Sequence, residues 1–348
     1  MCVRKAVNEM LGSLAEDAGI RREDVSQVCV VGNTCMHHLF LGISPASLVH
    51  APYTPAVSER LVLNAGDYGL AVQERAELIM LSDIAGYVGA DTCGCLLAIR
   101  QDQQEEISLM IDIGTNGEMV LGNRERMVTC STAAGPAFEG AKIECGMRGA
   151  AGAVDHVKYE DGKWNYTTVG NKPAVGLCGS GLIDLVAGLL EAGMLDENGV
   201  LRSGQEKQGV FILVPPERGG NERGVYLTQK DLGEVQLAKA AIAAGIQMLM
   251  ERLGITEDDI CSVYIAGAFG NYMDPVSAGK IGLLPATLVK KVKPVGNAAG
   301  EGAKIALVNE KEMLEMDELV RKIEFVELAA SADFQDHFID ELGFETGE

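Results

Sequence analysis

The apolar residues at the beginning of the chain recur at the spacing of an α-helix. They stand four, four, three and four positions apart, at Val3, Val7, Leu11, Leu14 and Ala18. This spacing places them on one face of a helix, and Gly19 follows where a left-handed residue commonly ends one. A polar segment then leads to VCVVGN at 28–33, a short apolar run that predicts a buried strand followed by a glycine bend.

The same pattern recurs near the other end of the chain. Ile242, Ile246, Leu249 and Leu253 form a helical face, Gly254 follows, and an acidic segment leads to VYIAGAFGN at 263–271. An offset of 235 positions pairs Gly19 with Gly254, Asp24 with Asp259 and Gly32 with Gly267. Chance recurrence of a common helix–strand unit is the alternative. We favour an internal duplication that builds two lobes on one plan.

Each copy is followed by a segment that begins with glycines and small residues and continues as a helix. These segments are DIAGYVGADTCGCLLAI at 83–99 and VGNAAGEGAKIALV at 295–308. Small residues let two helices or a helix and a backbone approach closely. We expect the two helices to face each other and to form a hinge between the lobes.

The middle of the chain predicts β-structure and a glycine-rich loop. Residues 107–131 are expected to form three strands, with Asn116-Gly117 as a hairpin turn. Residues 131–154, rich in glycine and alanine, predict an ordered loop region. The last segments predict a helix that ends at Gly193, a hairpin at 209–228 and an acidic tail at 331–348 that frays.

Composition narrows the class of protein. The chain has 348 residues, 47% of them hydrophobic, without an apolar run of about 20 residues that could span a membrane. The beginning lacks a signal-peptide pattern, so we expect a cytoplasmic protein without membrane association. The net charge of −21 argues against nucleic acid as a partner. Nine cysteines show no C-x-x-C spacing, which favours reduced thiols over a metal site.

The segment IDIGTNGE at 111–118 carries the candidate chemistry. A glycine-rich turn directs several backbone N–H groups toward one point and can bind an anion, here at Gly114, Thr115, Asn116 and Gly117. Asp112 at the strand end is suited to hold hydrated Mg²⁺, and Glu118 could point to the same face. An anion-binding turn beside a cation-binding carboxylate is the combination that phosphoryl transfer requires. The alternative is a hairpin whose polar side chains only satisfy turn N–H groups.

Two further glycine bends are candidates for ligand contact. In IAGAFGN at 265–271 the small residues would let a flat ligand lie against the backbone, although a plain strand–helix turn explains them as well. Gly179 and Ser180 begin a predicted helix, where an anion could bind or Ser180 could cap the helix. Glu139 and Lys142 either face the cleft in which such a ligand would bind or form an exposed ion pair. The adjacent His37 and His38 point about 100° apart on a helix, which favours packing or capping over metal binding.

The order of these motifs resembles the superfamily of sugar and acetate kinases, actin and heat-shock chaperones (ASKHA). The resemblance matches Asp112 and the 114–117 turn to its second phosphate motif. It matches Gly267, Ala268, Phe269 and Gly270 to its adenosine motif, and 83–99 and 296–308 to its connecting helices. It implies an α/β fold of two ribonuclease-H-like lobes that clasp ATP and Mg²⁺. We therefore expect 1–100 in the first lobe, 101–330 in the second lobe, and 331–348 as a tail.

Several longer motifs narrow the resemblance to the C-terminal part of the reductive activators of corrinoid proteins. They are VVGNTCMHHLFLGISP, APYTPAV, DIGTNGE, STAAGPAFEGAKI, GLCGSGLIDLVAGLL and YIAGAFGNYMDP. The resemblance implies that ATP hydrolysis drives an electron from a [2Fe–2S] cluster to a Co(II) corrinoid, giving Co(I). The corrinoid would belong to a partner in a methyltransferase system, as for an O-demethylase activating enzyme, and a homodimer is compatible with it. Asp112 and Glu118 would be the catalytic residues.

Three departures limit what the resemblance implies. The ferredoxin-like cysteine run is absent, so we expect the [2Fe–2S] cluster only on an upstream domain outside this chain. The first lobe begins at its late helix, without an early phosphate hairpin, so we expect a lobe that is incomplete at its N-terminus. Ala266 stands where the kinases tend to have glycine. A small-molecule kinase or acyl phosphotransferase, and a non-catalytic docking module, are therefore kept as alternative functions.

Overall fold

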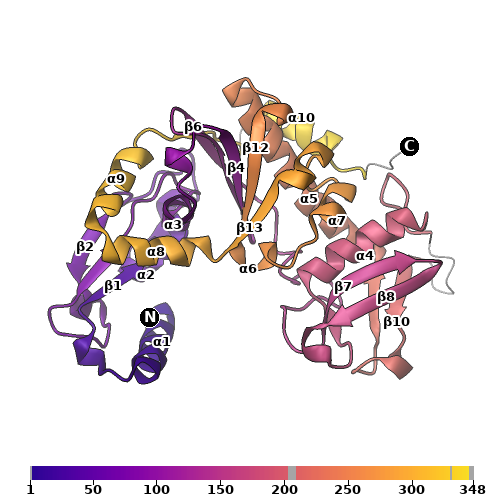
Figure 1. Ribbon diagram of the computed structural model, residues 1–348, viewed down its shortest axis with the longest axis horizontal. Coiled ribbons are helices and arrows are strands. Elements are labelled where there is room, and N and C mark those ends of the chain that lie inside the picture. Colours follow the sequence, from indigo (N-terminus) through magenta and orange to yellow (C-terminus); the bar gives the residue numbers. More distant parts are fainter. Residues whose placement is uncertain (1, 203–208, 330, 345–348) are drawn as a thin grey trace. The chain divides into compact units, whose positions relative to one another are not determined.

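The computed structural model describes residues 2–202, 209–329 and 331–344. It divides into two compact units that interleave along the chain (Figure 1). Unit 1 comprises residues 1–105, 123–129 and 297–325. Unit 2 comprises residues 106–122, 130–296 and 326–348. Among the described residues, no helix combines the length and the apolar composition needed to cross a bilayer.

Unit 1 has a three-stranded sheet in the order β1-β3-β2, with β1 (Gln27–Val30) parallel to β3 (Glu77–Met80) and β2 (Leu61–Asn64) antiparallel to it. Its helices are α1 (Cys2–Ala18), α2 (Thr34–Leu41), α3 (Ala90–Ile99), α8 (Ala298–Val308) and α9 (Glu310–Val320). The first predicted helix is confirmed, and Gly19 after it has φ +67°.

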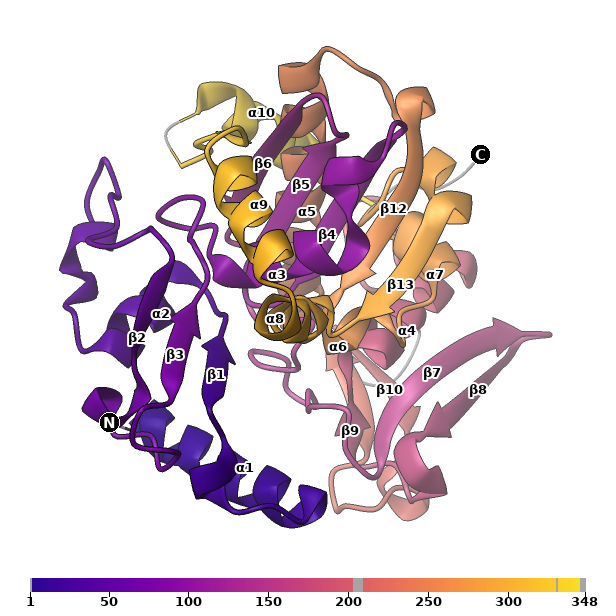
Figure 2. The ribbon, with the colours of Figure 1, turned by 60° about the vertical axis from the view of Figure 1, so that its left-hand side comes forward.

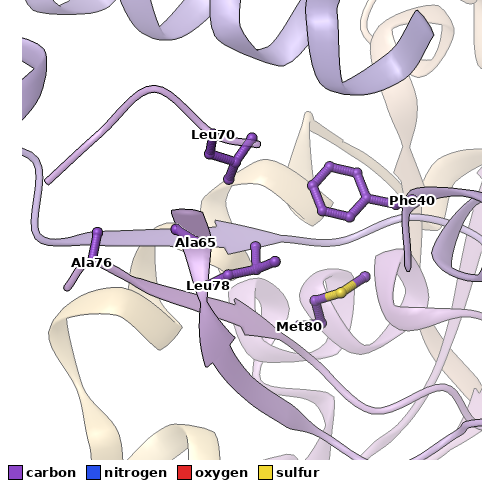
Figure 3. Close-up of a cluster of buried hydrophobic side chains, with 6 residues drawn as sticks. All are labelled: Phe40, Ala65, Leu70, Ala76, Leu78 and Met80. Atoms are coloured by element: carbon purple, nitrogen blue, oxygen red, sulfur yellow. The ribbon is translucent and has the colours of Figure 1, made fainter. Parts of the chain in front are cut away.

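The core of unit 1 lies between the sheet and the helices at its start. Figure 3 shows this cluster of buried side chains, formed by Phe40, Ala65, Leu70, Ala76, Leu78 and Met80. Val3 and Val7 of α1 pack against the cluster. The apolar face predicted for this helix therefore covers the core, as its spacing indicates.

Unit 2 contains most of a six-stranded sheet in the order β13-β12-β4-β5-β6-β14. Its strands are β4 (Ile107–Ile113), β5 (Gly117–Gly122), β6 (Met127–Thr132), β12 (Ile260–Ala266), β13 (Val292–Gly296) and β14 (Glu324–Phe325). The three strands predicted within 107–131 are confirmed. Helix α5 (Gln229–Leu253) packs on the sheet. It lies so close to β5 that a Cβ on Gly117 would be 3.3 Å from Cγ1 of Ile242.

A second sheet in unit 2 has the order β8-β7-β9 and is covered by α4 (Gly179–Glu191) (Figure 1). Its strands are β7 (Ala153–Glu160), β8 (Lys163–Thr168) and β9 (Gly176–Leu177). A Cβ on Gly181 would lie 2.2 Å from the Val154 carbonyl oxygen, so α4 can approach β7 this closely only with glycine there. The predicted hairpin at 209–228 is confirmed as β10 (Val210–Val214) and β11 (Val225–Thr228).

The expectation of a frayed tail is wrong for residues 331–344. Helix α10 (Ala332–Asp340) packs on α5, and Phe344 after it is 3% exposed. The buried ammonium of Lys239 on α5 lies 3.7 Å from the Glu341 carboxylate. The tail is held because its few apolar and hydrogen-bonding groups meet matching groups on α5. Residues 345–348 of the predicted tail lie outside the described part.

The predicted duplication recurs in detail. Each copy has a long helix, a 3₁₀ turn, a strand, and then a parallel neighbouring strand followed by a helix. In the 3₁₀ turns, Asp24 accepts a hydrogen bond from the Arg21 N–H at 3.1 Å, and Asp259 accepts one from the Thr256 N–H at 2.9 Å. These donors and acceptors are 235 positions apart, like the glycines that end the two helices.

Helices α3 and α8, both in unit 1, approach each other through glycine (Figure 2). A Cβ on Gly302 would lie 1.8 Å from the Gly94 carbonyl oxygen, and a Cβ on Gly94 would lie 2.6 Å from the Ala299 carbonyl oxygen. The expected facing of the two small-residue helices is confirmed. Their action as a hinge stays a prediction.

Candidate functional site

The hairpin of β4 and β5 presents the predicted phosphate turn. Asp112 lies opposite Glu118 and Ile113 lies opposite Gly117 in the antiparallel register, so Asp112 and Glu118 point to one face of the sheet. Within the turn, the Gly114 N–H donates to the Asn116 carbonyl oxygen at 2.9 Å. The turn is anchored from outside by the Gly135 N–H, which donates to the Thr115 carbonyl oxygen at 2.8 Å.

The second glycine bend lies directly beside Asp112. Strand β12 runs parallel to β4 and pairs Ala266 with Asp112, so both strands end at the same edge of the sheet. Gly267 has φ +88°, and a Cβ there would lie 2.9 Å from Asp112 Oδ1. Only glycine combines this backbone conformation with this proximity. Asp112 and the Gly267 bend therefore lie side by side within unit 2.

Residues 267–270 form the short helical turn α6 (Gly267–Gly270) after β12. The backbone thus bends where the adenosine motif is predicted. The side chains of Ala268 and Phe269 lie outside the described part of the chain. Helix α7 (Pro275–Lys280) follows, begun by Asp274, whose side chain accepts a hydrogen bond from the Val276 N–H.

Glu139 contacts the phosphate turn. The Thr115 hydroxyl donates to Glu139 Oε2 at 3.1 Å, and a Cβ on Gly114 would lie 3.4 Å from Glu139 Oε1. Lys142 pairs with Glu234 at 3.2 Å instead. The alternative that Glu139 and Lys142 form an exposed ion pair is therefore wrong. The sequence places Glu139 in a glycine-rich loop 24 positions after Thr115, and no pattern in the chain indicates that they meet.

Glu118, the other predicted catalytic carboxylate, is half-buried. Its Oε1 accepts a hydrogen bond from the Ser131 hydroxyl at 3.3 Å. Ser131 lies on the neighbouring strand β6, so this bond directs the Glu118 carboxylate along the face of the sheet.

A pocket of about 580 Å³ adjoins the turn through Glu139. Its wall includes Phe138, Glu139, Met147, Arg148, Tyr272 and the beginning of α4 at Cys178, Gly179 and Ser180. Gly179 and Ser180 thus lie on the pocket wall, and their role in anion binding stays a prediction. Ser180 does not cap its helix, because its hydroxyl donates to the Asp155 carbonyl oxygen at 2.8 Å and Cys178 is the N-cap residue. The sequence did not indicate Met147, Arg148 or Tyr272, which reach this wall only through the fold.

The histidine pair is buried and packs inside unit 1, which agrees with the first of the two expected roles. His37 Nδ1 lies 3.0 Å from the buried Asp83 carboxylate. His38 Nδ1 lies 2.7 Å from the Thr34 carbonyl oxygen, and its Nε2 accepts a hydrogen bond from the Ala56 N–H at 2.9 Å. In residues 2–202, 209–329 and 331–344, no three His, Cys, Asp or Glu side chains gather as a metal site.

The cysteines whose side chains are described are all free thiols. Burial raises the pKa of Cys29 to about 11, and it also raises the pKa of the fully buried Cys93. These thiols therefore stay protonated at neutral pH, which suits packing and opposes metal binding.

Two family models match the chain. The C-terminal domain of RACo, the ASKHA domain, matches residues 106–348, and the RACo middle region matches residues 1–104. The predicted ASKHA-type fold is therefore confirmed. The turn at 114–117 and the bend at 267–270 both lie inside the residues that the first of these models covers, and their contact with a nucleotide stays a prediction.

Individual relatives agree with this match. The corrinoid activation enzyme RamQ of Eubacterium limosum is 34% identical over 352 residues, which cover 97% of this chain and 59% of the relative. The Co(II) methylated amine-specific corrinoid protein reductase of Methanosarcina barkeri is 29% identical over 303 residues, covering 80% of this chain and 54% of the relative.

A solved structure of a reductive activator for corrinoid, iron-sulfur protein is similar along nearly the whole chain. It has a TM-score of 0.90 and 37% sequence identity, and the match covers 98% of this chain and 56% of that one. The chain thus spans between half and three fifths of the length of the proteins it matches.

Proposed function

Because this chain belongs to the family of reductive activators of corrinoid proteins, we propose that it forms the ATP-binding and partner-docking part of such an activator. The activator uses ATP hydrolysis to make the reduction of a Co(II) corrinoid to Co(I) favourable. The partner is a corrinoid protein of a methyltransferase system, and the activator works in the cytoplasm, with a homodimer as its assembly. The names of the relatives support reduction of a corrinoid as the reaction, since each name refers to the activation or reduction of a corrinoid or a corrinoid protein.

The observation that carries the nucleotide assignment is the meeting of Asp112 and Gly267. The phosphates of ATP are held at the Gly114–Gly117 turn, where backbone N–H groups suit an anion. The adenosine lies along the bend at Gly267–Gly270. Both contacts lie at the ends of adjacent parallel strands, so one nucleotide reaches both.

Mg²⁺ fits this arrangement through the Asp112 carboxylate. Mg²⁺ in nucleotide sites is commonly held by one or two carboxylates together with phosphate oxygens and water. Bound there, it would neutralise phosphate charge that the acidic chain would otherwise repel, at a net charge of −21. Asp112 would hold the ion, and the turn at Gly114–Gly117 would orient the phosphates.

The [2Fe–2S] cluster does not fit the described residues. No three potential ligands lie together in them, and the thiols with a resolved shift have raised pKa values. We assign the cluster to a region outside this sequence. The contribution of this chain is then the nucleotide-dependent step, which can act on a partner only if ATP binds two conformations of the activator with different affinity.

The proposal is tested by measuring MgATP binding by calorimetry and ATP hydrolysis by phosphate release. We predict that Asp112→Asn abolishes hydrolysis and weakens the binding of MgATP at least tenfold, because the carboxylate beside the phosphates is lost. Glu125→Gln in the exposed turn between β5 and β6 is the control and should behave like the wild type. Unchanged hydrolysis in Asp112→Asn would remove this residue from the site.

The pocket beside the turn favours one alternative, a small-molecule kinase or acyl phosphotransferase. Such an enzyme needs a chamber for a second substrate next to the phosphates, and the pocket of about 580 Å³ is large enough. A small molecule that stimulates ADP release in the absence of any corrinoid protein would favour this function. Binding of a corrinoid protein without any binding of MgATP would favour a docking module.

A further inference from the structure

We propose that Glu139 is the catalytic carboxylate that orients and deprotonates the attacking water in ATP hydrolysis at the Asp112 turn. The inference rests on the proposed nucleotide site and adds to it a residue from a separate loop. It is carried by the position of the Glu139 carboxylate relative to Thr115 and Gly114.

Both carboxylate oxygens of Glu139 are directed at the phosphate turn. Oε2 accepts the Thr115 hydroxyl at 3.1 Å, and Oε1 lies 3.4 Å from the position that a Cβ on Gly114 would take. Each carboxylate oxygen has two lone pairs, so the bond to Thr115 leaves acceptor capacity for a water molecule. A water held there would lie beside the turn where the terminal phosphate is proposed.

The backbone holds this carboxylate in place. The Glu139 N–H donates to the Pro136 carbonyl oxygen at 3.2 Å, and the Gly140 N–H donates to the Ala137 carbonyl oxygen at 3.0 Å. Ala137 and Phe138, which precede Glu139, are 1% and 3% exposed and anchor this part of the 133–141 loop in the core. A fixed backbone position is what a positioned catalytic base requires, because a displacement of about 1 Å costs much of the rate.

The side chain itself is exposed and lies on the pocket wall, so water reaches it. In the part of the chain that the structure describes, no Lys, Arg or His lies within ion-pair distance of it. Lys142, the nearest basic residue in the sequence, is engaged by Glu234. Its oxygens therefore remain available as hydrogen-bond acceptors for water.

The other two carboxylates of the site have different surroundings. Asp112 lies against the Gly267 bend, where it can hold a cation, and Glu118 is engaged by Ser131 on the sheet. Only Glu139 approaches the turn from the side of the pocket. This geometry assigns the water to Glu139 and leaves Asp112 to cation binding.

The step balances without another reactant. The water oxygen forms a bond to the γ-phosphorus while the bond from that phosphorus to the β,γ-bridging oxygen breaks. The electron pair of that bond leaves with ADP, and one proton of the water passes to the Glu139 carboxylate and then to solvent. The products are ADP and inorganic phosphate.

The test compares Glu139→Gln with Glu144→Gln in the full chain. Glu144 is an exposed carboxylate in the same loop whose Oε2 accepts the Tyr226 hydroxyl at 3.1 Å, outside the proposed site. We expect Glu139→Gln to lower kcat at least 100-fold, in the range typical of a lost general base. Its Kd for MgATP should stay the same or decrease, because a negative charge beside the phosphates is removed. Glu144→Gln should leave both quantities unchanged.

A second variant separates a chemical role from a structural one. Glu139→Ala leaves space for a small carboxylate, so added formate should restore part of its hydrolysis, and formate should not affect Glu144→Ala. Hydrolysis by Glu139→Gln within twofold of the wild type would overturn the inference while leaving the proposed function intact. A parallel loss of MgATP binding in Glu139→Gln would also overturn it. A wild-type chain that does not bind MgATP would overturn both.

Discussion

Asp83 is 2% exposed in the interior of unit 1. Burial raises the pKa of its carboxyl, although hydrogen bonds from His37 and the Ala90 N–H act in the opposite direction. Desolvation therefore outweighs two charge-assisted contacts at this position, since the ionised form loses more hydration than the hydrogen bonds return. Burial likewise raises the pKa of Asp184 in unit 2, although hydrogen bonds from Ser277, the Val157 N–H and His156 act in the opposite direction.

The raised pKa of Asp83 predicts how stability depends on pH. The folded state binds the proton more tightly than the unfolded chain, whose Asp titrates near 3.9. The free energy of unfolding should therefore decrease as the pH rises from about 4 to the raised pKa, by about 1.4 kcal/mol per pH unit over that interval. Asp83→Asn cannot ionise and should show a flatter dependence between pH 4 and 7 in urea unfolding.

The exposed Asp67→Asn in the same unit is the control for Asp83→Asn and should keep the wild-type dependence on pH. An equally steep dependence in Asp83→Asn would show that other groups carry it.

At the scale of single residues, the sequence predicted some features of the candidate site and missed others. The strand end at Asp112 and the bends at Gly114 and Gly267 could be predicted, because a strand-end acid and glycine bends have local signatures. Their contact with a nucleotide stays a prediction. The contact of Glu139 with Thr115 could not be predicted, because it depends on how the loop at 133–141 folds back over the sheet. The pocket wall at Arg148 and Tyr272 was missed for the same reason, since these residues come from separate segments.

Among the elements, helices with a strong apolar period and a terminal glycine were predicted well. Helices α1 and α5 end at Ala18 and Leu253, each directly before its predicted glycine. Helix α10 was not predicted, because its acidic composition alone is typical of an exposed tail. The contacts that hold it are made with α5 and cannot be read from its own sequence. His337 Nε2, for example, lies 2.9 Å from the Glu251 carboxylate of that helix.

The crossing of α3 and α8 depends on the absence of side chains at Gly94 and Gly302. We predict that Gly302→Ala lowers the free energy of unfolding of unit 1 by about 1 to 3 kcal/mol, because the new methyl group meets a backbone carbonyl that cannot rotate away. Urea unfolding followed by circular dichroism measures this change. Val308→Ala on the same helix, 85% exposed, should change stability by less than about 0.5 kcal/mol.

A loss below about 1 kcal/mol in Gly302→Ala would mean that the two helices can separate at little cost. The close approach would then be unimportant for the stability of unit 1.

At the scale of the whole molecule, unit 1 is assembled from distant parts of the chain. Arg60 donates to the Asp317 carboxylate at 2.7 Å, and the Ser82 hydroxyl donates to it at 2.9 Å. Arg100 pairs with Glu312. The folded structure of residues 60–100 therefore depends on contacts with residues 312–317, although the family model of the middle region ends at 104.

This interleaving predicts that residues 1–104 do not fold stably alone. Without residues 297–325 they lose α8 and α9, the partners of Gly94, Arg60 and Ser82. A peptide of residues 297–325 added to the 1–104 fragment should restore cooperative urea unfolding. The same peptide with Gly302→Val should fail, because it cannot approach α3. Cooperative unfolding of the 1–104 fragment alone would contradict the prediction.

The repeated plan of the chain ends in an asymmetry. In the first copy, the bend after β1 is sealed by Asn33, whose side-chain oxygen accepts the Met36 N–H and begins α2. In the second copy the corresponding bend has Gly267 in a left-handed conformation and only a four-residue helical turn. The first copy thus satisfies a backbone N–H of its bend with an amide side chain, whereas the second copy makes its bend with a left-handed glycine. Exchanging these few residues between the two copies would test which of the two bends binding of MgATP requires.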